Sequence, residues 1–343
     1  MNSLVLRGRR EDAIRRAWGS RPNAGLRAGS AAYGLGVDCR NLAWTVGLMK
    51  PARCPVPVIS VGGLAIGGSG KTPLTVAVAR HLADAGSSVA VLTAGYADEL
   101  AVHAAANPDI RVAGGRDRRT LAIEAAQAGS TVVVLDSGFQ HRRLHRDLDI
   151  VAIFVDYRGN RRLLPAGPFR ERWASLSRAD AVVLVRRQAP PAAAGCLSGE
   201  IQGAFLGTHV ATARIRPIGL EPLTEAAREV GTPDPQVAVA GIMWPGAFFG
   251  ALGELGLSPG NRISLADHAP VNRSTRTAIV DQAGAGGVVC TGKDAAKLVA
   301  SVPATVPIWS LLEQVSWEEG GDALLEAAVR TARLGAGDPG GER

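Results

Sequence analysis

Residues 56–72 read VPVISVGGLAIGGSGKT, and the predicted fold follows from this stretch. The run from Val56 to Val61 is mainly apolar and β-branched, which indicates a buried strand. The glycines after it predict a tight turn, and the apolar side chains of residues 72–85 recur at helical spacing. We therefore expect a strand, a glycine-rich turn and a helix in succession.

Residues 67–72, GGSGKT, have the composition of a loop that binds phosphate groups. Glycines let successive backbone N–H groups point inward at phosphate oxygens. In this pattern the Lys71 ammonium would reach the β- and γ-phosphates, and the Thr72 hydroxyl would bind Mg²⁺. The strict pattern requires glycine at position 65, where this chain has alanine, so a glycine-rich turn without a ligand is the alternative. The predicted nucleotide-binding residues are Ala65, Ile66, Gly67, Gly68, Ser69, Gly70, Lys71 and Thr72.

Further apolar, β-branched runs occupy residues 88–93, 131–135, 150–155 and 181–185. Strands without alternation, separated by helices, are typical of a parallel sheet that is covered on both faces. The predicted fold class is therefore α/β, a P-loop NTPase-type parallel sheet domain with a second, smaller α/β domain. Asp136 follows the second of these runs, where an acid in P-loop enzymes holds or orients Mg²⁺. An aspartate that only begins a turn is the alternative.

The domain organisation follows from a cluster of prolines between residues 215 and 235. Such clusters are typical of linkers between domains. We expect a P-loop domain over residues 1–225 and a smaller α/β domain over residues 226–334. The glycine-rich tail, residues 335–343, is expected to be disordered.

The N-terminal segment is basic and carries a helical pattern. Ala13, Ile14, Ala17 and Trp18 recur at helical spacing, with arginines between them. A basic amphipathic helix of this kind could lie on a membrane. The alternative is an ordinary surface helix whose basic face is solvated.

The composition restricts the classes of partner. The 343 residues include 38 Lys and Arg against 31 Asp and Glu, a formal net charge of +7. This excess indicates an anionic partner, such as a nucleotide, a phosphorylated substrate or an anionic lipid surface. Aromatic residues make up only 4%, and no basic stretch is interleaved with them, so we expect no nucleic-acid partner. No apolar run approaches 18 residues, so a membrane-spanning helix is not expected.

Several longer motifs accompany the phosphate loop, and together they resemble the tetraacyldisaccharide 4′-kinase family, the lipid A 4′-kinases. The motifs are PVISVGGLAIGGSGKTP at 57–73, TAGY at 93–96, GGRDR at 114–118, LDSGFQHRRLHRDLDIV at 135–151, LLPAGPFRE at 163–171, VAVAGIMWPGAFFGAL at 237–252, LADH at 265–268 and TGKDAAK at 291–297. The phosphate loop is generic, but the combination of DSGFQHRRLHRDLDI, LLPAGPFRE and AGI-x3-GAFF is specific, and the order of these segments matches the family.

This resemblance implies an activity and a location. The expected reaction transfers the γ-phosphate of ATP to the 4′ hydroxyl of a tetraacyldisaccharide 1-phosphate, the lipid A disaccharide precursor, with Mg²⁺ as the metal. The resemblance also implies a kinase that binds peripherally to the anionic inner-membrane surface, at its cytoplasmic face. The P-loop domain would then be the kinase domain.

The resemblance also assigns roles to residues outside the loop. Asp98 matches the general base, and His268 would orient or polarise it. The predicted catalytic residues are Asp98, His268, Lys71 and Arg170, and the predicted metal ligands are Thr72, Asp136, Glu99 and Glu171. The alternatives are a solvated loop for the acidic pair, a surface or capping role for the histidine, and a surface ion pair for Arg170 and Glu171.

Three positions depart from the family pattern. TAGY at 93–96 lacks the usual arginine, Ser137 replaces a second aspartate, and Gly292 replaces a glutamate. A hydroxyl binds magnesium less well than a carboxylate does. Two alternative functions therefore stay open: a divergent P-loop nucleotide-binding regulatory protein, and a kinase of another lipid or sugar acceptor.

Overall fold

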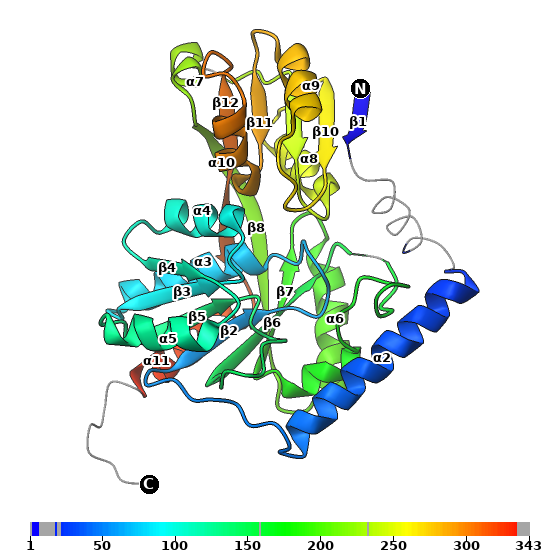
Figure 1. The fold of residues 1–343 in the computed structure, drawn as a ribbon, viewed down its shortest axis with the longest axis vertical. Helices are drawn as coiled ribbons and strands as arrows, with labels where there is room; N and C mark the ends of the chain where they lie inside the picture. Colours follow the sequence, from blue (N-terminus) through cyan, green and yellow to red (C-terminus); the bar gives the residue numbers. More distant parts are fainter. Residues whose placement is uncertain (1, 7–17, 19–21, 158, 232, 335–343) are drawn as a thin grey trace. The chain divides into compact units, whose positions relative to one another are not determined.

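The computed structural model describes residues 2–6, 18, 22–157, 159–231 and 233–334 (Figure 1). Most of the predicted N-terminal helix and the predicted disordered tail at 335–343 lie outside the described residues. The chain divides into two compact units. We call residues 14–214 with 315–343 the P-loop unit, and residues 1–13 with 215–314 the smaller unit.

The P-loop unit contains a parallel sheet with the strand order β8-β7-β6-β2-β5-β3-β4. Its strands are β2 (Val58–Gly62), β3 (Val89–Thr93), β4 (Arg111–Gly114), β5 (Val132–Asp136), β6 (Leu148–Phe154), β7 (Ala181–Arg186) and the first part of β8 (His209–Pro222). Every residue of β2, β3 and β5 is buried, as expected for strands covered on both faces. The predicted parallel α/β fold is confirmed.

Most helices of this unit pack against the sheet, whereas the first one contacts residues 163–171. The helices are α2 (Ala24–Thr45), α3 (Lys71–Asp84), α4 (Ala97–Ala106), α5 (Arg118–Gln127), α6 (Pro191–Ala204) and α11 (Gly321–Arg333), with a short 3₁₀ helix η1 (Trp173–Arg178). Ala122 and Ala125 of α5 share a core cluster with Val58, Leu92 and Val133 of the strands. Helix α3 contacts α11 and the same strands, so its apolar side chains cover the other face.

The smaller unit is a second α/β structure. Its strands are β1 (Asn2–Leu6), β9 (Val237–Ala240), β10 (Asn261–Leu265), β11 (Val288–Cys290) and most of β12 (Ile308–Trp317). They run in the order β1-β10-β9-β11-β12, with parallel pairs throughout. The helices are α7 (Glu225–Val230), α8 (Pro245–Glu254), α9 (Arg273–Ala283) and α10 (Gly292–Ser301).

The division between the units differs from the predicted boundaries. It falls at Ile215 inside β8 and again at Val315 inside β12, so two strands connect the units. The first prolines of the predicted linker lie within β8, not in a loop. Helix α11 belongs to the P-loop unit because its buried face packs on α3. Strand β1 belongs to the smaller unit because it pairs with β10.

The packing of α11 leads to a stability prediction. Leu324 of α11 is buried, so Leu324→Ala removes packed methyl groups and should lower the free energy of unfolding by about 2–4 kcal/mol. Urea unfolding followed by circular dichroism measures this change. Glu326→Ala on the exposed side of the same helix is the control, with an expected change below about 0.5 kcal/mol. Equal stabilities of the two variants would show that α11 does not contribute to the core.

Candidate functional site

The phosphate loop connects β2 to α3, as predicted. Gly67, Gly68 and Gly70 have φ angles of 59°, 64° and 79°, a backbone region that residues with a side chain rarely adopt. Helix α3 begins at Lys71, and its N-cap residue is Gly70. The first turn of α3 therefore presents backbone N–H groups and the positive end of the helix dipole at the loop. This geometry suits an anion.

The polar side chains of the loop also lie at the start of α3. Lys71 Nζ donates a hydrogen bond to Ser69 Oγ at 3.0 Å, and Thr72 is buried at the start of α3. The Lys71 ammonium group thus lies beside the loop backbone, close to where the phosphates of a bound nucleotide are expected. Ala65 and Ile66 precede the turn and take part in the contacts described next.

The 163–171 segment borders the phosphate loop. Ile66 N donates to Pro168 O at 2.9 Å, and Arg170 N donates to Leu64 O at 2.7 Å. Ala65 and Phe169 form an isolated antiparallel bridge between these contacts. The motif LLPAGPFRE therefore lies beside the nucleotide loop, although about a hundred residues separate the two in the sequence, and it brings Arg170 to the loop.

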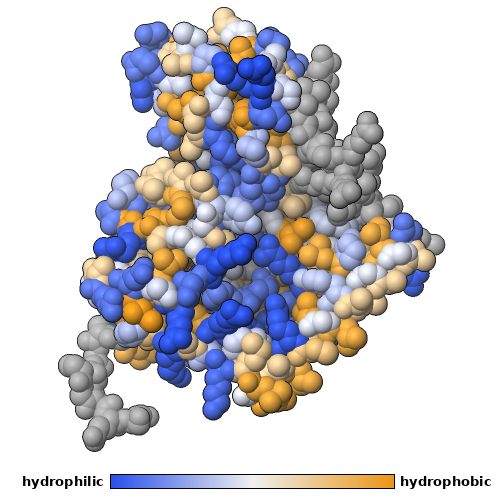
Figure 2. Space-filling view, in the orientation of Figure 1, coloured by the Kyte–Doolittle hydropathy of each residue, from blue (hydrophilic) through white to orange (hydrophobic). Residues whose placement is uncertain are grey.

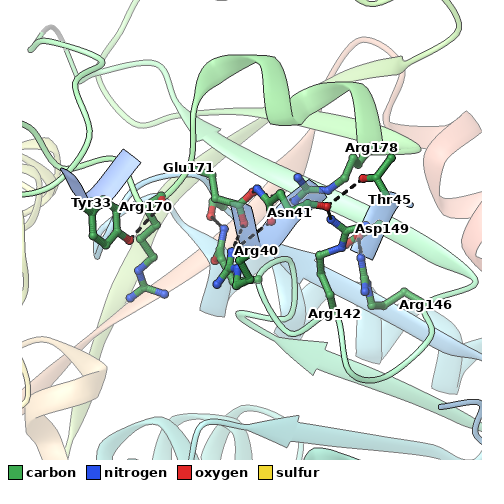
Figure 3. A network of polar contacts seen from close by, with 12 residues as sticks. Tyr33, Arg40, Asn41, Thr45, Arg142, Arg146, Asp149, Arg170, Glu171 and Arg178 are labelled. Atoms are coloured by element: carbon green, nitrogen blue, oxygen red, sulfur yellow. Dashed lines mark hydrogen bonds and ion pairs between the residues drawn. The ribbon is translucent and has the colours of Figure 1, made fainter. Parts of the chain in front are cut away.

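Glu171, the last residue of this segment, has a different environment from the one predicted (Figure 3). Its fully buried carboxylate accepts hydrogen bonds from Arg40 at 3.2 Å on Oε1, and from Asn41 and Arg178 at 2.9 Å each on Oε2. A buried charge is tolerated when it is paired and hydrogen-bonded in this way. Glu171 therefore joins α2 and the 3₁₀ helix to the loop region. These contacts argue against the predicted metal role and against a surface ion pair.

The acidic pair lies in the first turn of α4. Asp98 and Glu99 are both buried, which rules out a solvated loop. Asp98 Oδ1 accepts a hydrogen bond from Glu99 N at 3.1 Å. Negative side chains are stabilised at a helix N-terminus, where the backbone N–H groups and the helix dipole are positive. The local sequence thus explains why α4 starts immediately before the two acids.

The TAGY and GGRDR motifs meet at the ends of β3 and β4. These two strands are parallel neighbours, so the segments that leave them lie side by side. A Cβ atom on Gly114 would lie only 2.7 Å from Gly95 Cα, and Gly95 has a φ of 96°. Only glycine permits this approach. The acidic pair lies on the segment that leaves β3, and Arg118 lies on the segment that leaves β4. Both segments therefore start at neighbouring strand ends on one edge of the sheet.

Arg118 is a site residue that the sequence analysis missed. Its side chain is buried, and Nη1 donates to Ser137 O at 3.3 Å. Burial lowers the pKa of the Arg118 guanidinium, the carboxylates of Asp136 and Glu99 oppose this effect, and Arg170 reinforces it. Arg118 therefore lies within electrostatic reach of these three site residues. The GGRDR motif was the available signal, but its spacing alone predicts no role.

Asp136 ends β5, as predicted, and is fully buried. His103 of α4 lies 2.9 Å from its Oδ2 atom, and Ser137 Oγ donates to Oδ1 at 3.1 Å. Ser137 has a φ of 59°, which is unusual for a residue with a side chain. His103 also escaped the sequence analysis, because nothing in the sequence signals a pairing across 33 positions.

The structure brings some of the predicted metal ligands into one site, but not Glu171. Asp136 and Glu99 act on the same guanidinium, whereas Glu171 is paired with arginines. Among the described residues no group of three or more His, Cys, Asp and Glu side chains could hold a metal ion. Mg²⁺ typically uses one or two carboxylates together with phosphate oxygens and water. The oxygen donors of Thr72, Asp136 and Glu99 fit that preference.

His268 belongs to the smaller unit, whereas Asp98 belongs to the P-loop unit. It follows β10, has a φ of 58°, and its Nε2 atom lies 3.8 Å from Asp267 Oδ1. The interaction between His268 and Asp98 that the family resemblance implies therefore stays a prediction.

The fold and the loop define the class of P-loop nucleotide-binding proteins. The profile of the tetraacyldisaccharide-1-P 4′-kinase family (LpxK) matches residues 23–330, and the chain belongs to this family. Among similar curated proteins is the tetraacyldisaccharide 4′-kinase of Geobacter sulfurreducens, 36% identical over 82% of this chain and 86% of the relative. That of Anaeromyxobacter sp. strain K is 33% identical over 94% of this chain and 93% of the relative.

A solved structure supports the same family. The crystal structure of LpxK from Aquifex aeolicus in complex with ATP has a TM-score of 0.67 and 26% sequence identity to this chain. The match covers 90% of this chain and 98% of the Aquifex chain. The fold class and the family predicted from the sequence are therefore both confirmed.

The burial of His141 leads to a prediction about pH. Burial, aided by Arg118 and other nearby arginines, lowers the pKa of His141 from 6.5 to about 4. Between these values the unfolded chain binds a proton that the folded chain does not. The free energy of unfolding should therefore fall as the pH drops from 6.5 towards 4. His141→Gln should make this fall less steep in urea unfolding at several pH values.

The neighbouring His145 provides the control for this measurement. Its side chain is about one third exposed, with Nε2 3.4 Å from Asp147 Oδ1. His145→Gln should retain the fall seen in the wild-type protein. The assignment to His141 is contradicted when its variant shows the same pH dependence as the wild type.

Proposed function

We propose that this protein is an ATP-dependent kinase that phosphorylates the 4′ hydroxyl of a tetraacyldisaccharide 1-phosphate, the lipid A disaccharide precursor. The observation that carries the proposal is the gathering of buried acids and arginines beside a phosphate loop, in a chain of this family. The names of the curated relatives support the same acceptor.

The nucleotide would be held by the loop. The backbone N–H groups of residues 67–72 and the Lys71 ammonium supply positive charge for the phosphates of ATP. Thr72, Asp136 and Glu99 would hold Mg²⁺, which would neutralise phosphate charge when bound. We leave Glu171 out of this set because Arg40, Asn41 and Arg178 already occupy its carboxylate.

The transfer step requires a base and positive charge. The 4′ oxygen of the sugar attacks the γ-phosphorus, the bond from that phosphorus to the β–γ bridging oxygen breaks, and ADP leaves. Asp98 would accept the hydroxyl proton as the new bond forms. Lys71, Arg118 and Arg170 would balance the charge of the transferring group. A contribution of His268 to the orientation of Asp98 is part of the same proposal.

The buried general base leads to a kinetic prediction. Asp98→Asn keeps the shape of the side chain but removes the proton acceptor, so kcat should fall by about 10²–10⁴-fold while the KM for ATP stays nearly constant. Transfer from radiolabelled ATP to tetraacyldisaccharide 1-phosphate measures both. Asp84→Asn, at an exposed carboxylate, is the control and should leave both constants unchanged.

Two outcomes would contradict this part of the proposal. Wild-type protein that binds ATP but transfers no phosphate to the acceptor would favour a regulatory P-loop protein or another acceptor. Unchanged turnover in the Asp98→Asn variant would remove this residue from the role of base.

We also propose that the protein binds peripherally to the anionic inner-membrane surface, at its cytoplasmic face, through the C-terminal end of α2. The large apolar side chains exposed at this end or just after it are Leu42, Val46, Leu48 and Met49. Figure 2 shows apolar residues gathered over the lower end of this helix. Arg142, whose guanidinium lies 5.8 Å from the Trp44 ring, adds positive charge beside them. No helix in the described part of the chain is long and apolar enough to span a bilayer.

This surface can be tested with vesicles. Leu48, just after the end of α2, is 81% exposed, so Leu48→Glu should not disturb the core but should place a negative charge on the lipid-facing surface. Cosedimentation with phosphatidylglycerol vesicles should fall several-fold, since both apolar contact and electrostatic attraction weaken. Leu206→Glu is the matched control, because Leu206 is 93% exposed outside α2. Equal losses in the two variants would contradict the proposed surface.

A further inference from the structure

We propose that His103 is a positioning residue that holds the Asp136 carboxylate in the orientation in which it meets the metal ion of the nucleotide. This inference rests on the proposed kinase function. His103 lies on α4, and Asp136 lies at the end of β5. The pair therefore connects the helix that carries the proposed base to the strand that carries the proposed metal ligand.

The geometry of the pair supports this role. His103 Nε2 lies 2.9 Å from Asp136 Oδ2, and both side chains are buried. A carboxylate can only accept hydrogen bonds, so the Nε2–H group is the donor. Ser137 Oγ donates to the other oxygen at 3.1 Å. These two donors, one on each oxygen, restrict rotation of the carboxylate about its Cβ–Cγ bond.

The second ring nitrogen of His103 indicates that the ring is not a packing residue alone. Nδ1 is buried and has no hydrogen-bond partner within the described part of the chain. A leucine would fill a similar volume without burying an unsatisfied nitrogen, which carries an unrecovered desolvation cost. The hydrogen bond to Asp136 is therefore the interaction that the imidazole supplies and an apolar side chain of similar size would not.

The charges around Asp136 explain why its orientation must be held. Arg118 acts electrostatically on Asp136 and donates to the carbonyl of the next residue, Ser137. A carboxylate released from His103 could turn towards this guanidinium and form an ion pair there. The His103 bond counters that rearrangement because it fixes Oδ2 from the α4 side. Partners of this kind typically change metal affinity or activity by about 10–100-fold when they are removed.

The position of His103 on α4 adds a second consequence. Glu99 and His103 are four residues apart, so they lie on the same face of the helix, one turn from each other. The proposed base and one proposed metal ligand lie in the first turn of α4. The bond from His103 to Asp136 therefore ties that turn to the end of β5. This hydrogen bond thus helps to fix the distance between the acids of α4 and Asp136 of β5.

The experiment compares two substitutions in the full-length protein. His103→Leu removes the donor, and His103→Gln places an amide donor at a similar reach. Binding of Mn²⁺ in the presence of ATP, followed by electron paramagnetic resonance, should weaken by about 10–100-fold in the leucine variant. The glutamine variant should recover most of the affinity. The Mg²⁺ concentration that gives half-maximal phosphate transfer should rise strongly in the leucine variant and only slightly in the glutamine variant.

A core substitution provides the control for lost stability. Val133→Ala removes buried methyl groups from β5 and leaves the hydrogen bond between His103 and Asp136 in place. It should lower the melting temperature while Mn²⁺ binds as in the wild type. Should the leucine variant fail to fold, His103→Asn, whose amide is shorter, takes its place and should bind Mn²⁺ more weakly than the glutamine variant.

The outcomes separate this inference from the proposed function. Wild-type affinity for Mn²⁺ in a folded His103→Leu variant, or no recovery in a folded His103→Gln variant, would overturn the role of His103. Wild-type protein that binds Mn²⁺ and ATP but does not phosphorylate the tetraacyldisaccharide acceptor would contradict the proposed function instead. The comparison of metal affinities among the variants would still decide the role of His103.

Discussion

The parallel direction of the strands in the P-loop unit is the constraint on which the site depends. Because β2, β3, β4 and β5 run the same way, the segments that leave them emerge at one edge of the sheet. That edge receives the phosphate loop, the acids of α4, Arg118 and Asp136. It also receives the positive N-terminal ends of three helices, which favour anions. An antiparallel sheet would have sent half of these groups to the opposite edge.

A second arrangement connects this edge to α2. Glu171 is a buried carboxylate whose charge two guanidinium groups balance and to which an amide donates a hydrogen bond. Tyr33 of α2 donates to the carbonyl of Arg170 at 3.1 Å (Figure 3). Arg170 N in turn donates to Leu64 O. The helix with the exposed apolar end is thus tied through one segment to the phosphate loop.

The site was predictable from the sequence wherever its signal is local. The phosphate loop combines apolar periodicity, glycine spacing and a Lys–Thr pair within a few residues, and the position of Asp136 follows from the strand before it. His103 and the two α2 partners of Glu171, Arg40 and Asn41, were not predictable, because 33 and about 130 positions separate the paired residues. The domain boundaries were displaced for the same reason, since α11 returns to α3 from the far end of the chain.

The amino-acid sequence by itself determined the central strands of the parallel sheet, the glycine-rich turn, the family of the protein and the candidates for nucleotide contact. These properties depend on residues close together in the chain, whose periodicity and backbone freedom act locally. Only the tertiary structure decided that Glu171 is neutralised by arginines, that Arg118 lies among the acids, and that His103 reaches Asp136. Such pairings depend on distances across the folded core, because burial removes the water that would otherwise screen each charge.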